Sequence, residues 1–237
     1  MPILGQPMLL RQIERLKRCV EIDRLLVATS TDPSDDPLVL LCREHGIECA
    51  RGSLSNVLER FVEAARSVCP DIVVRLTGDC PLADSALIDA VIRRFLEHDD
   101  DYLSNCAPPT YPDGLDVEVM RFSCLEEAHR EAVLPSHREH VTLFIRQQPE
   151  RYQLGNYADI VDRSHMRWTV DEAQDFEFVR KVYEALYPDK PDFTTQDVLE
   201  LLEREPQLVS INSQFKRGEG GKKSLLADAA YLAGNQS

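Results

Sequence analysis

No stretch of the 237-residue chain approaches the roughly 20 consecutive apolar residues that a helix needs to cross a membrane. The N-terminus also lacks the basic-then-apolar layout of a secretory signal. No two cysteines have Cys-x-x-Cys spacing, and the seven cysteines are scattered, which argues against a disulfide framework and against a zinc site. These absences predict a cytoplasmic protein with reduced cysteines that does not associate with membranes.

Basic residues are scarce as well. The 27 Lys and Arg residues face 41 Asp and Glu residues, which gives a formal net charge of -14. A chain of this charge repels a polyphosphate backbone, and no stripe of basic residues interleaved with aromatics offsets the repulsion. Nucleic acid is therefore excluded as a partner, while the 43% hydrophobic content is enough for the core of one domain.

The hydrophobic pattern of the first hundred residues alternates between strand and helix periodicity. It predicts strands at 25–29, 47–50, 72–74 and 102–104, and helices at 37–44, 57–68 and 84–97. This rhythm is typical of an α/β protein with three layers and a mostly parallel sheet.

The pattern loosens after Asn105. A proline-containing loop at 107–114 leads to an apolar stretch at 115–120, helices at 123–131 and 136–147, and a strand at 152–155. Insertions of this kind usually build the substrate side of a site. A strand at 166–170 and helices at 172–186 and 194–203 complete a domain over 1–213, and residues 214–237 are expected to form a mobile C-terminal tail.

Asp79 is the first candidate site residue. It follows the apolar run at 72–74, which reads as a buried parallel strand, so Asp79 lies at the sheet edge where α/β proteins bind ligands. Gly78 lets the backbone approach a ligand, and a carboxylate there supplies the hard oxygen that Mg²⁺ prefers when it bridges phosphates. The alternative is an ordinary turn aspartate.

Asp171 is the second candidate, because it ends the expected strand at 166–170 and opens a helix. A sheet can bring two such strand ends together. The alternative is that Asp171 caps the helix together with Gln174, three residues later.

Several motifs in order make the chain resemble one family. They are LGQPML at 4–9, ATS at 28–30, RGS at 51–53, NVLER at 56–60, RLTGDCPL at 75–82, YPDGLDVE at 111–118, REHVT at 138–142 and RWTVD at 167–171. With them the chain resembles cytidylyltransferases of the spore coat polysaccharide biosynthesis protein F type. It is more distantly similar to the synthetases of CMP-keto-deoxy-octulosonate and CMP-sialic acids.

The resemblance implies a Rossmann-like nucleotide-diphospho-sugar transferase fold, which moves CMP from CTP to a sugar or sugar acid for polysaccharide synthesis and releases pyrophosphate. It also implies a homodimer formed through 105–155. Asp79 and Asp171 would hold Mg²⁺, and Arg75 would touch the nucleotide or pair with a buried acid. The implied nucleotide-binding residues are Gly52, Ser53, Asn56, Thr77 and Gly78, although Ser53 and Asn56 taken alone read as a helix cap and a surface amide. The implied sugar-binding residues are Asp113, Asp116, Glu118, Arg138 and His140.

One departure from the family pattern affects activity. In the family, a first strand and a loop of the type Gln-Ala-Arg-x-x-Ser-x-Arg-x-Pro-Gly-Lys, roughly 20 residues by ordinary element lengths, precede the segment matching 4–9. Without them we expect a sheet that lacks its first strand, exposed apolar surface beside it, and weak or absent catalysis. Two alternatives follow: a glycosyltransferase of the same fold, and a non-catalytic sugar-binding remnant.

Overall fold

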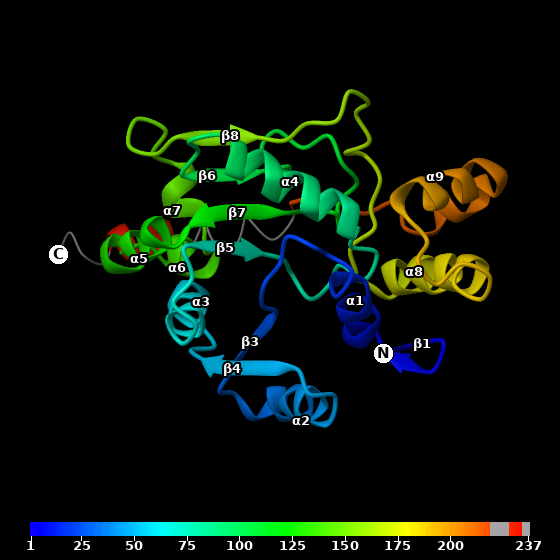
Figure 1. Ribbon diagram of the computed structural model, residues 1–237, viewed down its shortest axis with the longest axis horizontal. Helices are drawn as coiled ribbons and strands as arrows, with labels where there is room; N and C mark the ends of the chain where they lie inside the picture. The colour runs from blue at the N-terminus through cyan, green and yellow to red at the C-terminus, as the bar shows by residue number, and fades with distance from the viewer. Residues whose placement is uncertain (219–227, 234–237) are drawn as a thin grey trace.

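The computed structural model describes residues 1–218 and 228–233. Its first part forms a small antiparallel strand pair, three α-helices, a 3₁₀ turn and a parallel two-stranded sheet (Figure 1). The elements are β1 (Pro2–Ile3), β2 (Gln6–Pro7), α1 (Met8–Leu16), β3 (Leu26–Ser30), the 3₁₀ turn η1 (Pro33–Asp35), α2 (Asp36–Glu44), β4 (Glu48–Gly52) and α3 (Val57–Arg66). Strands β3 and β4 pair in parallel, as expected for a strand–helix–strand unit.

A four-stranded sheet in the order β5-β7-β6-β8 forms the other part. Its strands are β5 (Ile72–Arg75), β6 (Tyr102–Ser104), β7 (Glu118–Arg121) and β8 (Leu154–Asn156). Strand β7 runs antiparallel to both β5 and β6, whereas β8 is parallel to β6. Three of the four strands therefore share one direction, which confirms the expected mixed, mostly parallel α/β sheet.

Two expectations for this region are corrected. The first is a buried parallel strand at 72–74: its partner β7 is antiparallel and its side chains are half-buried. The second is a single sheet: within residues 1–218 and 228–233, β3 pairs only with β4 and β5 only with β7, so the β3–β4 pair is separate from the four-stranded sheet.

Helices cover both faces of the four-stranded sheet. On one face, α4 (Ser85–Glu97) places Ile88 and Phe95 in a core cluster with Leu103 and Val119. On the other face, α5 (Phe122–Glu131) joins Tyr102 and Met120 in a second cluster. Because successive strand residues point to opposite faces, adjacent residues of β6 and β7 serve different clusters. The three-layer arrangement is confirmed.

The expected helix at 136–147 is broken. It forms two short helices, α6 (Pro135–Glu139) and α7 (Leu143–Arg146), separated at His140–Thr142, where the buried Val141 has a φ of 25°. The break turns Thr142 toward the sheet, where its hydroxyl donates to Glu118 at 2.6 Å.

The expected strand at 166–170 is also wrong. Its backbone bonds go to two different loops: the Trp168 amide donates to Asp113 and the Val170 amide to Asp79. One isolated bridge, between Asp113 and Arg167, takes the place of a ladder.

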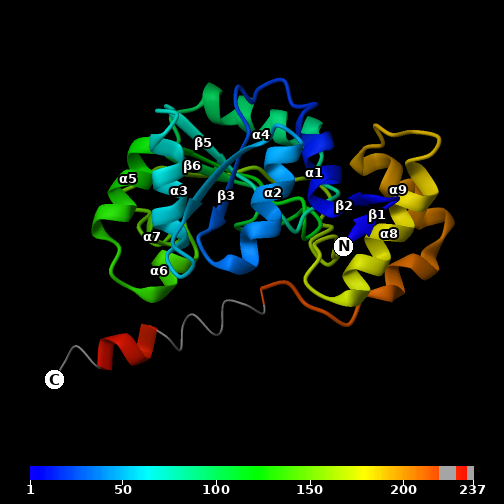
Figure 2. The ribbon, with the colours of Figure 1, turned by 90° about the horizontal axis from the view of Figure 1, so that it is seen from below.

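Helices α8 (Ala173–Leu186) and α9 (Thr195–Arg204), with the 3₁₀ turn η2 (Pro206–Ile211), form one end of the molecule beside α1 (Figure 2). Trp168, Phe178 and Tyr183 are buried in their shared core. Of the expected tail, residues 219–227 and 234–237 lie outside the described part. None of the described helices has the length and apolar character needed to span a bilayer.

Candidate active site

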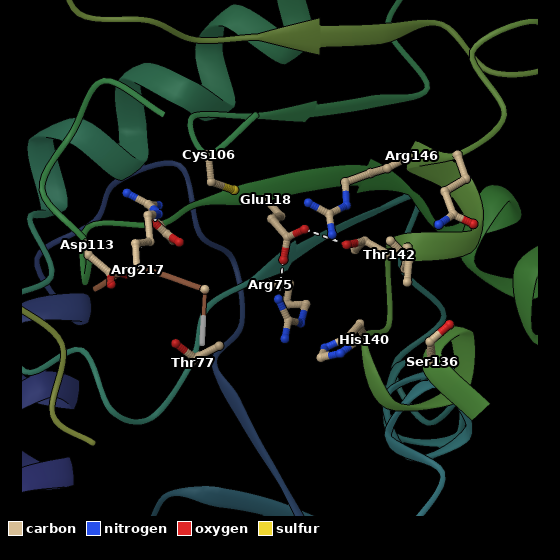
Figure 3. Close-up of a pocket in the computed structure, with 14 residues that line it drawn as sticks. Arg75, Thr77, Cys106, Asp113, Glu118, Ser136, His140, Thr142, Arg146 and Arg217 are labelled. Atoms are coloured by element: carbon tan, nitrogen blue, oxygen red, sulfur yellow. Dashed lines mark hydrogen bonds and ion pairs between the residues drawn. The ribbon is translucent and has the colours of Figure 1, made fainter. Parts of the chain in front are cut away.

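A cavity of about 630 Å³ opens at the carboxyl ends of β5 and β6, where α/β folds place ligands (Figure 3). We call it the central pocket. Its walls come from the end of β5, the loop before β7, the α6–α7 break and the start of the C-terminal segment. The lining residues are Arg75, Thr77, Cys106, Asp113, Asp116, Glu118, Ser136, His140, Thr142, Leu143, Arg146, Gln147, Arg217 and Gly218.

Glu118 lies at the centre of this pocket (Figure 3). It is 5% exposed and pairs with the Arg75 guanidinium, and it accepts hydrogen bonds from the hydroxyls of Tyr102 and Thr142, each at 2.6 Å. Burial alone would raise the pKa of Glu118, but Arg75 and the two hydroxyls outweigh it and lower that pKa. Glu118 therefore stays ionised and holds Arg75 in place, which confirms the expected pairing of Arg75 with a buried acid.

Asp113 and Asp116 form an acidic wall of the pocket, and Arg217 pairs with both. Its guanidinium forms an ion pair with Asp116, lies 3.9 Å from an Asp113 oxygen, and donates to the Tyr111 carbonyl at 3.2 Å. Burial raises the pKa of Asp116 and raises that of Asp113 to about 6, although Arg217 opposes both shifts. Burial in this wall therefore disfavours the ionised forms of Asp113 and Asp116.

Replacing Asp113 with asparagine is expected to stabilise the protein above pH 6. Folding raises the pKa of this carboxyl from 3.8 to about 6, so the folded state binds the proton more tightly and loses stability as pH rises across that window. The variant lacks this loss. We expect its unfolding free energy to match the wild type near pH 3 and to exceed it by about 3 kcal/mol at pH 8.

Denaturant titrations at several pH values measure this difference. Asp162→Asn is a control of opposite sign, because hydrogen bonds from Ser164 lower the pKa of Asp162. An Asp113→Asn variant that gains nothing between pH 4 and pH 8 would contradict the raised pKa.

The two predicted metal ligands lie on adjacent backbone segments. The Val170 amide donates to the Asp79 carbonyl at 2.9 Å, and the Thr169 hydroxyl contacts the same oxygen at 3.4 Å. Neither carboxylate lines the central pocket. Both act on its acidic wall, because the charge of Asp79 raises the pKa of Asp116 and that of Asp171 raises the pKa of Asp113.

The alternative role of Asp171 as a helix cap is wrong. The capping box of α8 is formed by Glu172 and Asp175, one residue further along. The Asp171 side chain is 55% exposed and accepts a hydrogen bond from the Arg167 guanidinium at 2.6 Å. The same guanidinium nitrogen also donates to Asp175 in the first turn of α8, at 2.9 Å.

Asp79 and Asp171 carry carboxylate oxygens, the donor type that Mg²⁺ prefers. Within residues 1–218 and 228–233, no group of three or more His, Cys, Asp or Glu side chains is arranged to hold a metal. Magnesium commonly uses only one or two protein carboxylates and takes its other oxygens from substrate phosphates and water. The Asp79 carboxylate accepts a weak hydrogen bond from the Cys80 thiol at 3.3 Å.

The residues expected at the base and ribose lie apart from the central pocket, at the junction of β4 and α3. The Asn56 side chain caps α3 by accepting from the Glu59 amide, and the Ser53 hydroxyl accepts from the Asn56 amide. Gly52 packs against Arg60, where an added Cβ would lie 2.9 Å from a side-chain carbon. Local structure thus explains the identities of all three, and nucleotide contact stays a prediction.

Among the expected sugar-binding residues, His140 lines the pocket with Asp113, Asp116 and Glu118, whereas Arg138 does not. Arg138 is exposed and its Nε lies 3.4 Å from the Ala132 carbonyl. Of the remaining nucleotide residues, Thr77 lines the pocket and Gly78 is exposed.

Sequence reasoning missed Thr142, Arg146 and Arg217. A continuous helix over 136–147 gave no reason for Thr142 to reach the sheet, and Arg217 lies in a segment without a periodic pattern. Only REHVT, the motif at 138–142, pointed to this wall.

Comparisons with known proteins identify the fold and the family of the chain. The solved structure of a cytidylyltransferase from Leptospira borgpetersenii superposes with a TM-score of 0.83 at 29% identity, covering 88% of each chain. The structure of CMP:2-keto-3-deoxy-manno-octonic acid synthetase complexed with CTP superposes with a TM-score of 0.58 at 15% identity, over 78% of this chain and 90% of that one. The second likeness shows the shared fold.

In sequence, the chain is 32% identical over 192 residues to the spore coat polysaccharide biosynthesis protein SpsF of Bacillus subtilis, covering 79% of this chain and 78% of the relative. The family model described as cytidylyltransferase matches residues 1–216, which include every site residue predicted above. The chain therefore belongs to the cytidylyltransferase family.

Proposed function

We propose that the protein transfers CMP from CTP to a sugar that carries an acidic group, for polysaccharide or surface glycan synthesis. A sugar hydroxyl would form a bond to the α-phosphorus as the bond to the β-phosphate breaks and pyrophosphate leaves. The observation that supports this most is the adjacency of Asp79 and the 170–171 backbone beside a cavity that holds three arginines.

Nucleotidyl transfer asks a protein mainly to position reactants and to neutralise phosphate charge. Asp79 and Asp171 would hold the magnesium ion, which when bound withdraws charge from the triphosphate. The other groups belong to the chain itself. Arg75, fixed by Glu118, presents its guanidinium to the pocket and needs no reorganisation when an anion arrives.

Two guanidinium nitrogens in the pocket walls support binding of an anion. The Nε atoms of Arg75 and Arg146 are buried and have no hydrogen-bond partner within the described part of the chain. Buried donors without partners are costly, so a ligand that accepts from them gains affinity. The charged oxygens of an acidic sugar accept more strongly from these donors than the hydroxyls of a neutral sugar do.

Pyrophosphate release tests the proposal. The full chain is mixed with magnesium, CTP and 2-keto-3-deoxy-manno-octonic acid, and pyrophosphate is measured by a coupled assay. We expect release that requires both the metal and the sugar acid and that falls when ATP replaces CTP. Release from CTP that is independent of any sugar would contradict transfer to an acceptor.

The sugar-binding remnant is a second candidate, because β3 and β5 belong to separate sheets within residues 1–218 and 228–233. A chain that binds the sugar acid, yet releases no pyrophosphate from CTP, would favour the remnant. Sugar transfer from a CMP-sugar without pyrophosphate would favour the glycosyltransferase.

The homodimer through 105–155 stays a prediction. Val133 and Leu154 in that segment are exposed apolar side chains, which supports burial against a second copy.

A further inference from the structure

Arg217 lies one residue beyond the region matched by the family model, which ends at residue 216. It nevertheless lines the central pocket, together with the following Gly218. In Figure 3, Arg217 and Asp113 occupy one side of the pocket, and Arg75 and Glu118 lie between them and the α6–α7 wall. The start of the C-terminal segment is therefore a wall of the pocket.

A later part of the same segment reaches the opposite wall. Asp228 is buried, and its carboxylate accepts from the Ser136 amide at 2.9 Å and from the Ser136 hydroxyl at 2.5 Å. Ser136 also lines the central pocket. Two separate residues of the C-terminal segment thus contact pocket walls, which ties the segment to this site.

Arg217 decides the charge of the pocket. The lining includes three arginines (Arg75, Arg146 and Arg217) and three carboxylates (Asp113, Asp116 and Glu118), so the formal charges cancel. Without Arg217, the lining has one negative charge in excess. Asp116 then loses its ion pair, while Asp113 keeps its ion pair with Arg167 at 3.5 Å. Such a wall would repel an anionic ligand.

The guanidinium also has donors to offer. Its described hydrogen bonds use one terminal nitrogen for the Tyr111 carbonyl and the other for Asp116, while its Nε lies 3.9 Å from Asp113. A guanidinium carries five N–H donors, and a carboxylate or phosphate can accept from two of them at once. Being held by two acids, Arg217 is fixed in position before the ligand arrives.

We propose that Arg217 is a specificity-determining residue that admits the anionic group of the acceptor sugar to the central pocket. The proposal rests on the proposed function for the identity of the acceptor. The group recognised is a carboxylate or a phosphate, and both have the oxygen pair that a guanidinium binds.

The test compares Arg217→Gln with Lys216→Gln, which makes the same charge change at the preceding, exposed residue. With CTP and magnesium held saturating, we expect Arg217→Gln to raise the KM for 2-keto-3-deoxy-manno-octonic acid about tenfold to a hundredfold. For Arg217→Gln, the kcat should change less than threefold and the KM for CTP should stay unchanged. The KM of Arg217→Lys for the sugar acid should lie between those of the wild type and Arg217→Gln, because lysine keeps the charge but lacks the paired N–H donors of a guanidinium.

Binding measurements separate this proposal from the proposed function. Calorimetric titrations of the full chain use the sugar acid, glucose 1-phosphate and mannose as probes. Loss of sugar-acid binding in Arg217→Gln supports a carboxylate ligand, and loss of glucose 1-phosphate binding supports a phosphate ligand. Wild-type binding with no pyrophosphate release would overturn only the proposed function.

Three results would overturn the role of Arg217. The first is binding of both anionic probes by Arg217→Gln as tightly as by the wild type. The second is a loss of mannose binding by Arg217→Gln as large as its loss of anion binding, and the third is an effect of Lys216→Gln as large as that of Arg217→Gln, because either would show a general change in the pocket. Thermal unfolding of the two variants checks that both remain folded.

Discussion

Asp79→Asn is expected to lower pyrophosphate release from CTP by about a thousandfold or more, since the variant loses one of two carboxylates proposed to hold the magnesium ion. An amide oxygen carries no charge and is a weaker ligand for a hard cation. The fold should survive, because the Asp79 backbone carbonyl, not its side chain, accepts from Val170. The assay is pyrophosphate release, with circular dichroism as the check on folding.

Asp99→Asn is the matched control for this prediction. Asp99 is an exposed carboxylate in the turn before β6, where it pairs with Arg121 at 2.7 Å. It is remote in sequence from both Asp79 and Asp171. We expect it to keep full activity, whereas Asp171→Asn should share the loss at Asp79. Undiminished release in Asp79→Asn would remove the metal role from that residue.

Glu118→Ala is expected to cost about 3–5 kcal/mol of stability, because it removes the carboxylate that pairs with the largely buried Arg75 guanidinium. The hydroxyls of Tyr102 and Thr142 lose their acceptor at the same time. For a domain of this size the loss corresponds to a fall in the midpoint of thermal unfolding of about 6–20 °C. Differential scanning calorimetry measures it.

Glu127→Ala is a matched control for this loss. Glu127 also contacts an arginine and a tyrosine hydroxyl, at 2.5 Å and 2.8 Å, but at the surface. Since water screens surface pairs, the Glu127 variant should unfold close to the wild-type temperature. Equal effects of the two substitutions would show that burial does not set the strength of the Glu118 network.

The fold could be predicted where one local signal decided it. The apolar stripe at 84–97 corresponds to α4, and Asp84 caps that helix by accepting from the amides of Ala86 and Leu87. The segment at 166–170 has the composition of a strand, yet its amides reach two loops, and no local pattern records which partners a backbone will meet.

The site shows the same limit. Asp113, Asp116 and Glu118 could be placed at the pocket from one motif, since they are close in sequence. Thr142 and Arg217 reach the pocket only through contacts made across 24 and 101 residues of chain. Side-chain pairs of that separation leave no periodic trace, so only the three-dimensional arrangement reveals them.

Helix α3 has a consequence for how two ligands would influence each other. It packs against β3 and β4 and also against α5 and α6, and its Leu58 and Val62 are buried with Leu125 in the second core cluster. One helix interface therefore sets the spacing between Gly52–Asn56 and the central pocket. A ligand that contacted both places would restrict the motion of the β3–β4 unit relative to the four-stranded sheet. A second ligand would then lose less conformational entropy on binding. Nucleotide and acceptor could in this way reinforce one another's affinity through mechanical stiffening alone.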